Sequence, residues 1–233
     1  RAGTGWLPTA AGMRATAQVG SWLLLRTASL RAAILLTVVA ATGAGETVLA
    51  AHQLVFTLFS TLAFALDALA IAAQSLIGAE LGASRPDAAR RLTAVMVRWS
   101  LGFGLITGVA LAAVAPWLPS LFTADPAVQA AATAGLWVLA ITQPLAGFVF
   151  VLDGVLIGAG DARYLALAGL VNLAVYAPVL WLLARSGPLL SAPDAGTRVV
   201  ALWVGFGVVY LGMRALTLGL RARGGAWMRL GTG

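Results

Sequence analysis

Two carboxylates stand inside long apolar stretches of the sequence. Asp67 lies midway along an apolar run that begins near Val48, and Asp153 lies close to the end of a later run. Because a charge at the centre of a bilayer costs about 2.5–3.5 kcal/mol on insertion scales, such residues are candidates for function. Each carboxylate could bind a proton, a cation or a cationic substrate, or it could make a structural hydrogen bond to a neighbouring helix. Asp67 lies deeper in its run than Asp153, so we expect it to contribute more to ion coupling, and the difference in depth argues against an aspartyl dyad.

Uncharged polar residues also fall inside the apolar runs. We expect them either to join Asp67 and Asp153 in a substrate- or cation-binding cavity or to make interhelical hydrogen bonds; they are Gln53, Gln74, Gln143 and Asn172. Pro144 and Pro178 lie inside two of the runs. Each is predicted to kink its helix, because proline removes a backbone hydrogen bond. Bent helices line binding sites in many transporters, although packing alone also produces such kinks.

Enzyme and metal-site signatures are missing from the sequence. The chain has one histidine and no cysteine, so it lacks the side chains that a zinc site or a histidine-based triad needs. No metalloprotease, nucleophile-elbow or P-loop pattern occurs. The 15 basic residues are all arginines, and most of them occupy short gaps between apolar runs, a distribution that does not suit a nucleic-acid partner. We therefore expect neither enzymatic activity nor a bound metal.

The elements that position these residues are predicted to be transmembrane helices. Of the 233 residues, 61% are apolar and only 10% are charged, more apolar surface than a soluble domain could hide. A helix needs about 20 apolar residues to cross a bilayer. Six runs qualify: Trp22–Thr42, Val48–Leu81, Leu92–Val114, Val128–Ile157, Tyr164–Ala184 and Val199–Leu220. Since these runs are too long for barrel strands, we predict an all-α polytopic membrane protein embedded in a lipid bilayer.

The arginines divide unequally between the two sides of this predicted bundle. One side collects 13 of them and the other collects 2, so the positive-inside rule predicts that both ends of the chain are cytoplasmic. Arg26 and Arg31, near the start of the first run, are expected to extend toward the inner headgroups. No arginine is expected in the middle of a span.

Residues 46–92 carry a recognisable pattern. It reads Glu46-x-x-Leu-Ala-Ala-His-Gln, then Leu66-Asp67-Ala-Leu-Ala-Ile-Ala-Ala-Gln74-Ser-Leu-Ile-Gly78-Ala-Glu-Leu-Gly82-Ala, then Ala88-Ala-Arg90. This pattern resembles the seventh and eighth helices of the MATE multidrug and toxic-compound extrusion transporters. Pro119-Ser-Leu-Phe-Thr-Ala-Asp125-Pro resembles the family's loop before helix ten, and Phe150-Val-Leu-Asp153-Gly-Val-Leu-Ile-Gly158-Ala-Gly-Asp161 resembles its DinF-like branch.

The resemblance covers residues 20–220 and implies one six-helix lobe of a twelve-helix antiporter that exports cationic or aromatic drugs. It implies an inter-lobe linker over residues 1–20, a transmembrane lobe over 21–220 and a basic cytoplasmic tail over 221–233, in the plasma membrane. The amino-terminal lobe would be the partner. The family's sodium-coupled branch has carboxylates in helices seven and ten, but here helix seven has none and Ala146 stands in the helix-ten region. Protons are therefore favoured over sodium as the coupling ion.

Two alternatives remain open at this point. One is a half-module of a lipid-linked oligosaccharide flippase from the same superfamily, whose cavity would carry several arginines or lysines to meet phosphates. The expected lack of mid-span arginine speaks against it. The other is a truncated fragment that does not transport.

Overall fold

Helices form all of the regular secondary structure in the computed structural model, which describes residues 10–228. Five of the six long segments are single helices: α1 (Ala10–Gly43), α2 (Glu46–Gly82), α3 (Pro86–Val114), α4 (Pro126–Gly158) and α5 (Ala162–Arg185). The sixth is made of α7 (Ala195–Val204), a π-helical segment η2 (Gly205–Tyr210) and α8 (Leu211–Arg223). Two short turns of helix, η1 (Leu118–Leu121) and α6 (Pro188–Ser191), lie in connections.

Each of the six long segments is long and apolar enough to cross a membrane, which confirms the predicted all-α class and number of spans. The first helix is longer than predicted, because α1 begins at Ala10 and includes much of the segment assigned to the linker. Residues 1–9 and 229–233, in the predicted linker and tail, lie outside the described residues. The division into linker, lobe and tail stays a prediction.

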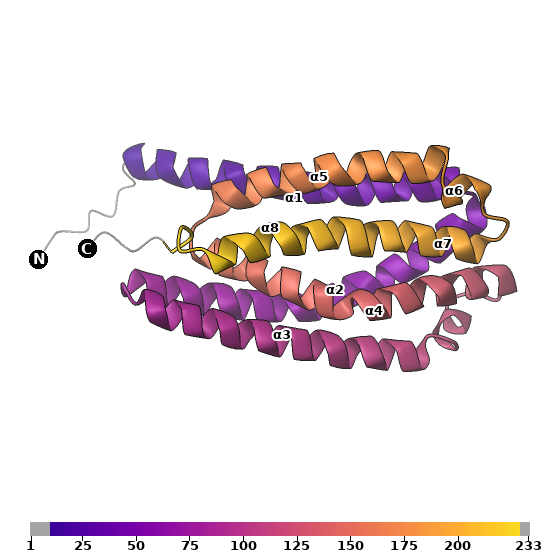
Figure 1. Ribbon diagram of the computed structural model, residues 1–233, viewed down its shortest axis with the longest axis horizontal. Coiled ribbons are helices and arrows are strands. Elements are labelled where there is room, and N and C mark those ends of the chain that lie inside the picture. Colours follow the sequence, from indigo (N-terminus) through magenta and orange to yellow (C-terminus); the bar gives the residue numbers. More distant parts are fainter. Residues whose placement is uncertain (1–9, 229–233) are drawn as a thin grey trace, which may run out of the picture.

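The long helices run side by side in an elongated bundle (Figure 1). Helix α4 is the central element and packs against α2, α3, α7 and α8, while α1 packs mainly along α5. The turns α2–α3 and α4–α5 lie at the same end of the bundle as the first and last described residues. The remaining connections lie at the opposite end, as six antiparallel spans require.

Helix boundaries follow local chemistry. Pro86 and Pro126 stand in the first turns of α3 and α4, where a missing N–H costs nothing. Asp125 caps α4 by accepting a hydrogen bond from the Ala127 N–H at 2.8 Å. Gly45 (φ 112°) and Gly160 (φ 73°) form the tight turns after α1 and α4, in backbone conformations that favour glycine.

Glycines let α4 approach its neighbours closely. A Cβ on Gly108 of α3 would lie 2.5 Å from the Ala140 carbonyl oxygen of α4, and one on Gly154 of α4 would collide with the backbone of Ala70 in α2. Close backbone contact of this kind is how helices associate in lipid, where the hydrophobic effect cannot drive packing.

Pro144 and Pro178 lie inside α4 and α5. The helical ranges of α4 and α5 continue through both prolines, and the kinks stay predictions.

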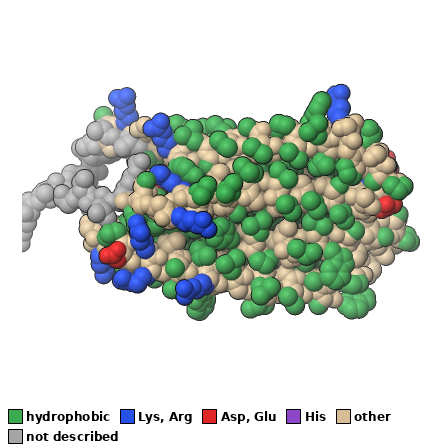
Figure 2. Space-filling view, viewed as in Figure 1, with side chains coloured by type: hydrophobic (Ala, Val, Ile, Leu, Met, Phe, Trp, Pro, Cys, Tyr) green, Lys and Arg blue, Asp and Glu red, His purple; other side chains and the backbone are tan. Residues whose placement is uncertain are grey.

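Hydrophobic side chains are spread along the whole length of the visible face, and most basic side chains gather toward one end (Figure 2). Large apolar groups such as Trp99, Ile106 and Ile141 are exposed, as contact with lipid requires. We call the end near the described termini the arginine-rich end; its connections and helix ends carry Arg85, Arg90, Arg91, Arg163, Arg221 and Arg223.

Candidate substrate and ion site

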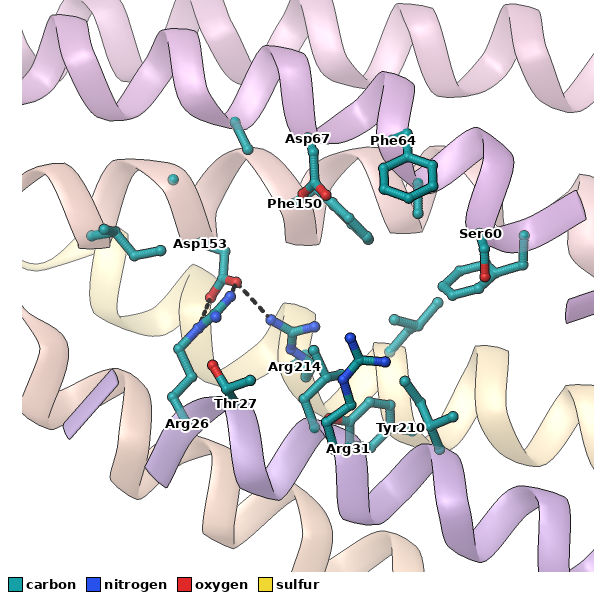
Figure 3. Close-up of a pocket in the computed structure, with 18 of the residues that line it drawn as sticks. Arg26, Thr27, Arg31, Ser60, Phe64, Asp67, Phe150, Asp153, Tyr210 and Arg214 are labelled. Carbon is teal, nitrogen blue, oxygen red and sulfur yellow. Dashed lines mark hydrogen bonds and ion pairs between the residues drawn. The ribbon is translucent and has the colours of Figure 1, made fainter. Parts of the chain in front are cut away.

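A cavity of about 430 Å³ opens among α1, α2, α4 and the last span. Both carboxylates predicted from the sequence, Asp67 and Asp153, line it, and three arginines face the same space: Arg26, Arg31 and Arg214 (Figure 3). Aromatic side chains form much of its apolar wall: Phe56, Phe59, Phe64, Phe150, Phe206 and Tyr210. The cavity thus combines charges of both signs with an aromatic surface.

Asp153 is neutralised by two arginines from two other helices. Arg26 of α1 forms an ion pair with it, with a hydrogen bond from Nε to Oδ1 of 3.4 Å. Arg214 of α8 donates from Nη2 to Oδ2 at 2.9 Å. The carboxylate is only 9% exposed, so its charge depends on these partners. Asp153 therefore joins α1, α4 and α8 at one wall of the cavity.

Asp67 is held differently. It projects from α2 into the cavity and is exposed, and no described arginine lies within ion-pair distance of its carboxylate. The positive charge of Arg26 acts on it across the cavity. Of the two carboxylates, Asp67 is the one open to a ligand.

Arg31 is the arginine of the cavity that is open to a ligand. Its side chain is exposed and points into the cavity from α1, about one and a half turns after Arg26. Within the described part of the chain it makes no ion pair with a carboxylate. Arg31 is thus available to an anionic group, as Asp67 is to a cationic one.

The π-helical segment η2 shapes the aromatic wall. A π-turn adds a residue to the turn and is frequent at functional sites. Here it brings Phe206 and Tyr210 into a stacked pair, with ring centroids 5.5 Å apart and planes at 25°, beside the cavity. Phe59 of α2 meets Phe206 edge-on at 5.5 Å. These three rings are buried, whereas Phe64 of α2 is an exposed aromatic side chain of the cavity, and an exposed ring can bind cations and flat apolar groups.

The remaining predicted residues do not all reach the cavity. Gln74 lines it, four positions beyond Ala70 on α2. Gln53 is exposed on α2 and is not among the residues that line the cavity. Gln143 is buried beside Gly108 of α3, where its amide makes no hydrogen bond with a described residue.

Asn172 occupies a separate, much smaller void behind the Arg26–Asp153–Arg214 cluster. It lies 3.4 Å from the Thr217 hydroxyl of α8. It therefore fits the structural alternative, an interhelical hydrogen bond, better than direct contact with a substrate.

Two expectations about arginine were wrong. Arg26 and Arg31 were expected to extend to the headgroups, and spans were expected to lack mid-span arginine, but Arg26, Arg31 and Arg214 all line the cavity. The sequence carried a signal, since these arginines stand inside apolar runs rather than between them.

The expected difference in depth between the two aspartates was also wrong. The backbones of α2 and α4 meet at Ala70 and Gly154, three residues after Asp67 and one residue after Asp153. Both carboxylates consequently face one cavity. The position of each aspartate along its own run did not reveal this, because α2 and α4 are shifted along their axes relative to each other.

Among residues 10–228, no group of three or more His, Asp or Glu side chains is arranged around a common point. What the cavity can do chemically is bind: it offers an open carboxylate, an open guanidinium and aromatic faces. A bundle of six long apolar helices with a charged cavity is the architecture of a membrane transporter.

Comparison with known proteins agrees with that class. The MatE family model matches residues 24–182, and the chain belongs to the MATE family of transporters, which are not enzymes. The chain is 32% identical to DETOXIFICATION 44, chloroplastic, of Arabidopsis thaliana over 218 residues, covering 91% of this chain and 37% of that protein. It is 29% identical to DETOXIFICATION 43 of the same plant, covering 92% of this chain and 38% of the relative.

Solved structures show the same fold. A multidrug resistance MATE transporter in the outward-facing conformation superposes with a TM-score of 0.76 at 17% identity, over 93% of this chain and 46% of that one. A MOP superfamily transporter from Pyrococcus furiosus, described by its authors as having a binding pocket of reverse polarity, gives a TM-score of 0.73 at 20% identity, over 88% of this chain and 42% of that one. The chain therefore spans less than half the length of these relatives.

Proposed function

We propose that this lobe forms half of a proton-coupled antiporter that exports small cationic or aromatic compounds, and that Asp67 is the group for which proton and substrate compete. The observation that carries the proposal is the contrast between the two cavity carboxylates. Asp153 is neutralised by Arg26 and Arg214, whereas Asp67 faces open space without an ion pair to a described residue. A carboxylate that has no ion-pair partner in the protein can bind a proton and a cationic substrate in turn.

Exchange follows from that competition. When Asp67 is ionised it attracts a cationic substrate, whose rings stack on the aromatic wall. When Asp67 binds a proton, the attraction is lost and the substrate is released. Since each ligand favours release of the other, inward flow of protons drives outward flow of substrate if the cavity opens alternately to the two sides.

A proton suits this site better than sodium. A sodium ion needs several oxygen ligands around it. A proton changes the net charge of the cavity by the same amount, but it binds to one oxygen of Asp67 and needs no further ligand. The small number of ligands that a proton needs therefore favours proton coupling.

The test is an Asp67→Asn variant in a transporter assembled from this lobe and an amino-terminal lobe. Asparagine keeps the shape of the side chain but does not titrate near neutral pH. Efflux driven by an imposed pH gradient in vesicles, normalised to folded protein, should fall by about 100-fold, the lower end of the range for loss of an acid–base group. Asp87→Asn, on the first turn of α3 outside the cavity, is the matched control. Near-normal gradient-driven efflux by Asp67→Asn would show that coupling lies elsewhere.

The same assembly tests the need for a second lobe. Because the chain covers 37% of DETOXIFICATION 44, and alternating access moves one lobe against another, we expect these residues alone not to transport. Drug resistance conferred by the 233-residue chain alone would contradict this expectation and would leave the role of Asp67 to be judged in the chain itself.

The arginines favour a second candidate, a substrate that carries a carboxylate or phosphate, including the lipid-linked phosphates of a flippase. The cavity contains three arginines and two aspartates, so its net charge is positive when both aspartates are ionised. Arg31 has no described carboxylate partner and could bind such an anion directly. The cavity therefore has the arginines that recognition of a phosphate requires.

Two dyes of similar size separate the candidates. If the substrate is cationic, an aromatic cation should be transported in preference to an aromatic carboxylate, and Arg31→Gln should leave that transport near normal. If the substrate is anionic, the carboxylate should be preferred and Arg31→Gln should abolish its transport. Arg91→Gln, at the arginine-rich end outside the cavity, controls for loss of one positive charge.

The cellular location is a further part of the proposal. We infer that the chain lies in the plasma membrane, as its resemblance to drug exporters implies. We also infer that both of its ends are cytoplasmic, because arginine gathers at the end that carries both described termini. Two of the Arabidopsis relatives are named chloroplastic. A fluorescent fusion viewed beside a plasma-membrane marker tests the location, and a chloroplast or other internal pattern would overturn it.

A further inference from the structure

A second concave surface lies away from the cavity, between α3 and α8 with α4 as its floor. Its volume is about 500 Å³. Val97 of α3, Phe148 and Leu152 of α4, and Leu216 and Leu220 of α8 make its apolar walls. Because Arg214 faces the cavity while Leu216, Gly219 and Leu220 face this groove, the two sites use different faces of α8.

A glycine keeps the groove open. A Cβ on Gly219 would lie 3.4 Å from the ring of Phe148, in ordinary contact, so a longer side chain there would have to extend into the groove. Helices α3 and α8 both pack on α4 but have no extensive contact with each other. The groove is therefore an apolar gap on the outer surface of a membrane bundle, where an acyl chain can lie.

One arginine lines the groove, and a second lies on a neighbouring helix near the same end. Arg223, near the end of α8, lines it directly. Arg90 of α3 lies on the same helix face as the lining residues Thr93 and Val97, at spacings of three and seven residues. Its Nη2 is 3.3 Å from the position that a Cβ on Gly225 would occupy, two residues after Arg223.

Neither guanidinium is neutralised within the described part of the chain, since no described carboxylate lies within ion-pair distance of Arg90 or Arg223. By contrast, neighbouring Arg85 pairs with Glu80 and Arg221 pairs with Asp161. Two unpaired cations thus stand at the mouth of an apolar groove, at the depth where a span ends and headgroups begin.

We propose that this groove is a binding site for an anionic phospholipid, with one acyl chain along Phe148 and Gly219 and the headgroup phosphate between Arg90 and Arg223. Basic pockets between transmembrane helices recognise anionic headgroups in this way. The two parts of the site select different parts of the ligand: the groove selects a chain, and the arginines select a negative headgroup. A zwitterionic lipid fills the groove but lacks the net negative headgroup, whereas free phosphate binds the arginines but lacks the acyl chain.

Native mass spectrometry of the purified chain tests the site, with phosphatidylglycerol and phosphatidylcholine of identical acyl chains added in equal amounts. The chain should retain phosphatidylglycerol preferentially. Arg90→Gln together with Arg223→Gln should reduce that preference by about fivefold for each arginine lost. Arg91→Gln is the matched control, because Arg91 is adjacent in sequence but lies on another helix face.

Gly219→Leu tests the chain-binding half of the site. It should reduce occupancy by both lipids while both arginines remain. Retention of the phosphatidylglycerol preference by the double arginine variant would overturn the proposal. So would unchanged phosphatidylglycerol binding by Gly219→Leu, or displacement of the lipid by millimolar inorganic phosphate, since either result would mean that charge alone holds the ligand.

Discussion

Gly154 of α4 lies directly against the backbone of Ala70 of α2, and the two aspartates of the cavity are close to this contact in sequence. The ideal Cβ position of Gly154 is 2.9 Å from the Ala70 Cα. Asp153 precedes the glycine by one residue, and Asp67 precedes Ala70 by three. The spacing between the two carboxylates therefore depends on how closely these two helices approach.

Substitution of Gly154 by alanine should separate α2 from α4. The added methyl group has no space beside backbone atoms, and overpacking of this kind costs about 1–3 kcal/mol. We expect a lower midpoint of thermal unfolding in detergent. Gly212→Ala in α8 is the control, because nothing lies within 4 Å of its Cβ position; that variant should be neutral or slightly stabilised. Equal effects of the two substitutions would show that the α2–α4 contact is not tight.

Removal of the Asp153 charge should destabilise the fold far more than removal of the Asp67 charge. Asp153→Asn leaves Arg26 and Arg214 near one another without a carboxylate, and breaking a buried pair in this way costs about 3–5 kcal/mol. Asp67→Asn breaks no described ion pair and should retain a near-normal unfolding midpoint. Adding Arg214→Gln to Asp153→Asn should restore part of the loss. Additive losses in the double variant would contradict a direct interaction.

Topology can be tested with reporter fusions at the connections. Fusions at Gly45, Ala124 and Ala192 should report the outside, and fusions at Ser84 and Gly160 should report the cytoplasm. The reason is the gathering of arginine at the end that holds Ser84 and Gly160. A reversed reading at Gly45 or Ala124 would overturn the orientation.

The start of the last span should respond to pH through Asp194. Its carboxylate accepts the Thr197 backbone N–H at 2.8 Å and the Thr197 hydroxyl at 2.8 Å, and these hydrogen bonds lower its pKa below the ordinary value. A lowered pKa means that the cap stabilises α7 above the unfolded-state pKa and that this stability is lost as pH falls through the folded-state pKa.

At neutral pH, Asp194→Ala should therefore unfold at lower temperature than the wild type, while Asp194→Asn should keep most of the cap. The difference between wild type and Asp194→Ala should shrink in acid. A difference that is constant down to acidic pH would mean that the carboxylate charge has no part in the cap.

The sequence was sufficient for the class of protein and for the six spans. Apolar runs of membrane length can be recognised one segment at a time, because each helix must satisfy its own backbone in lipid. The motifs around Asp67 and Asp153 also sufficed to indicate the family. Prolines and capping aspartates such as Pro126 and Asp125 mark helix starts, because these effects act within one turn.

Only the tertiary structure decided which polar residues share a site. Gln74 reaches the cavity and Gln53 and Gln143 do not, although all three stand in apolar runs. Arg26 and Arg214, 188 positions apart, meet on Asp153. Such convergence depends on the rotation of each helix about its axis and on where glycines allow backbones to touch, and neither quantity is contained in the hydropathy of a single segment.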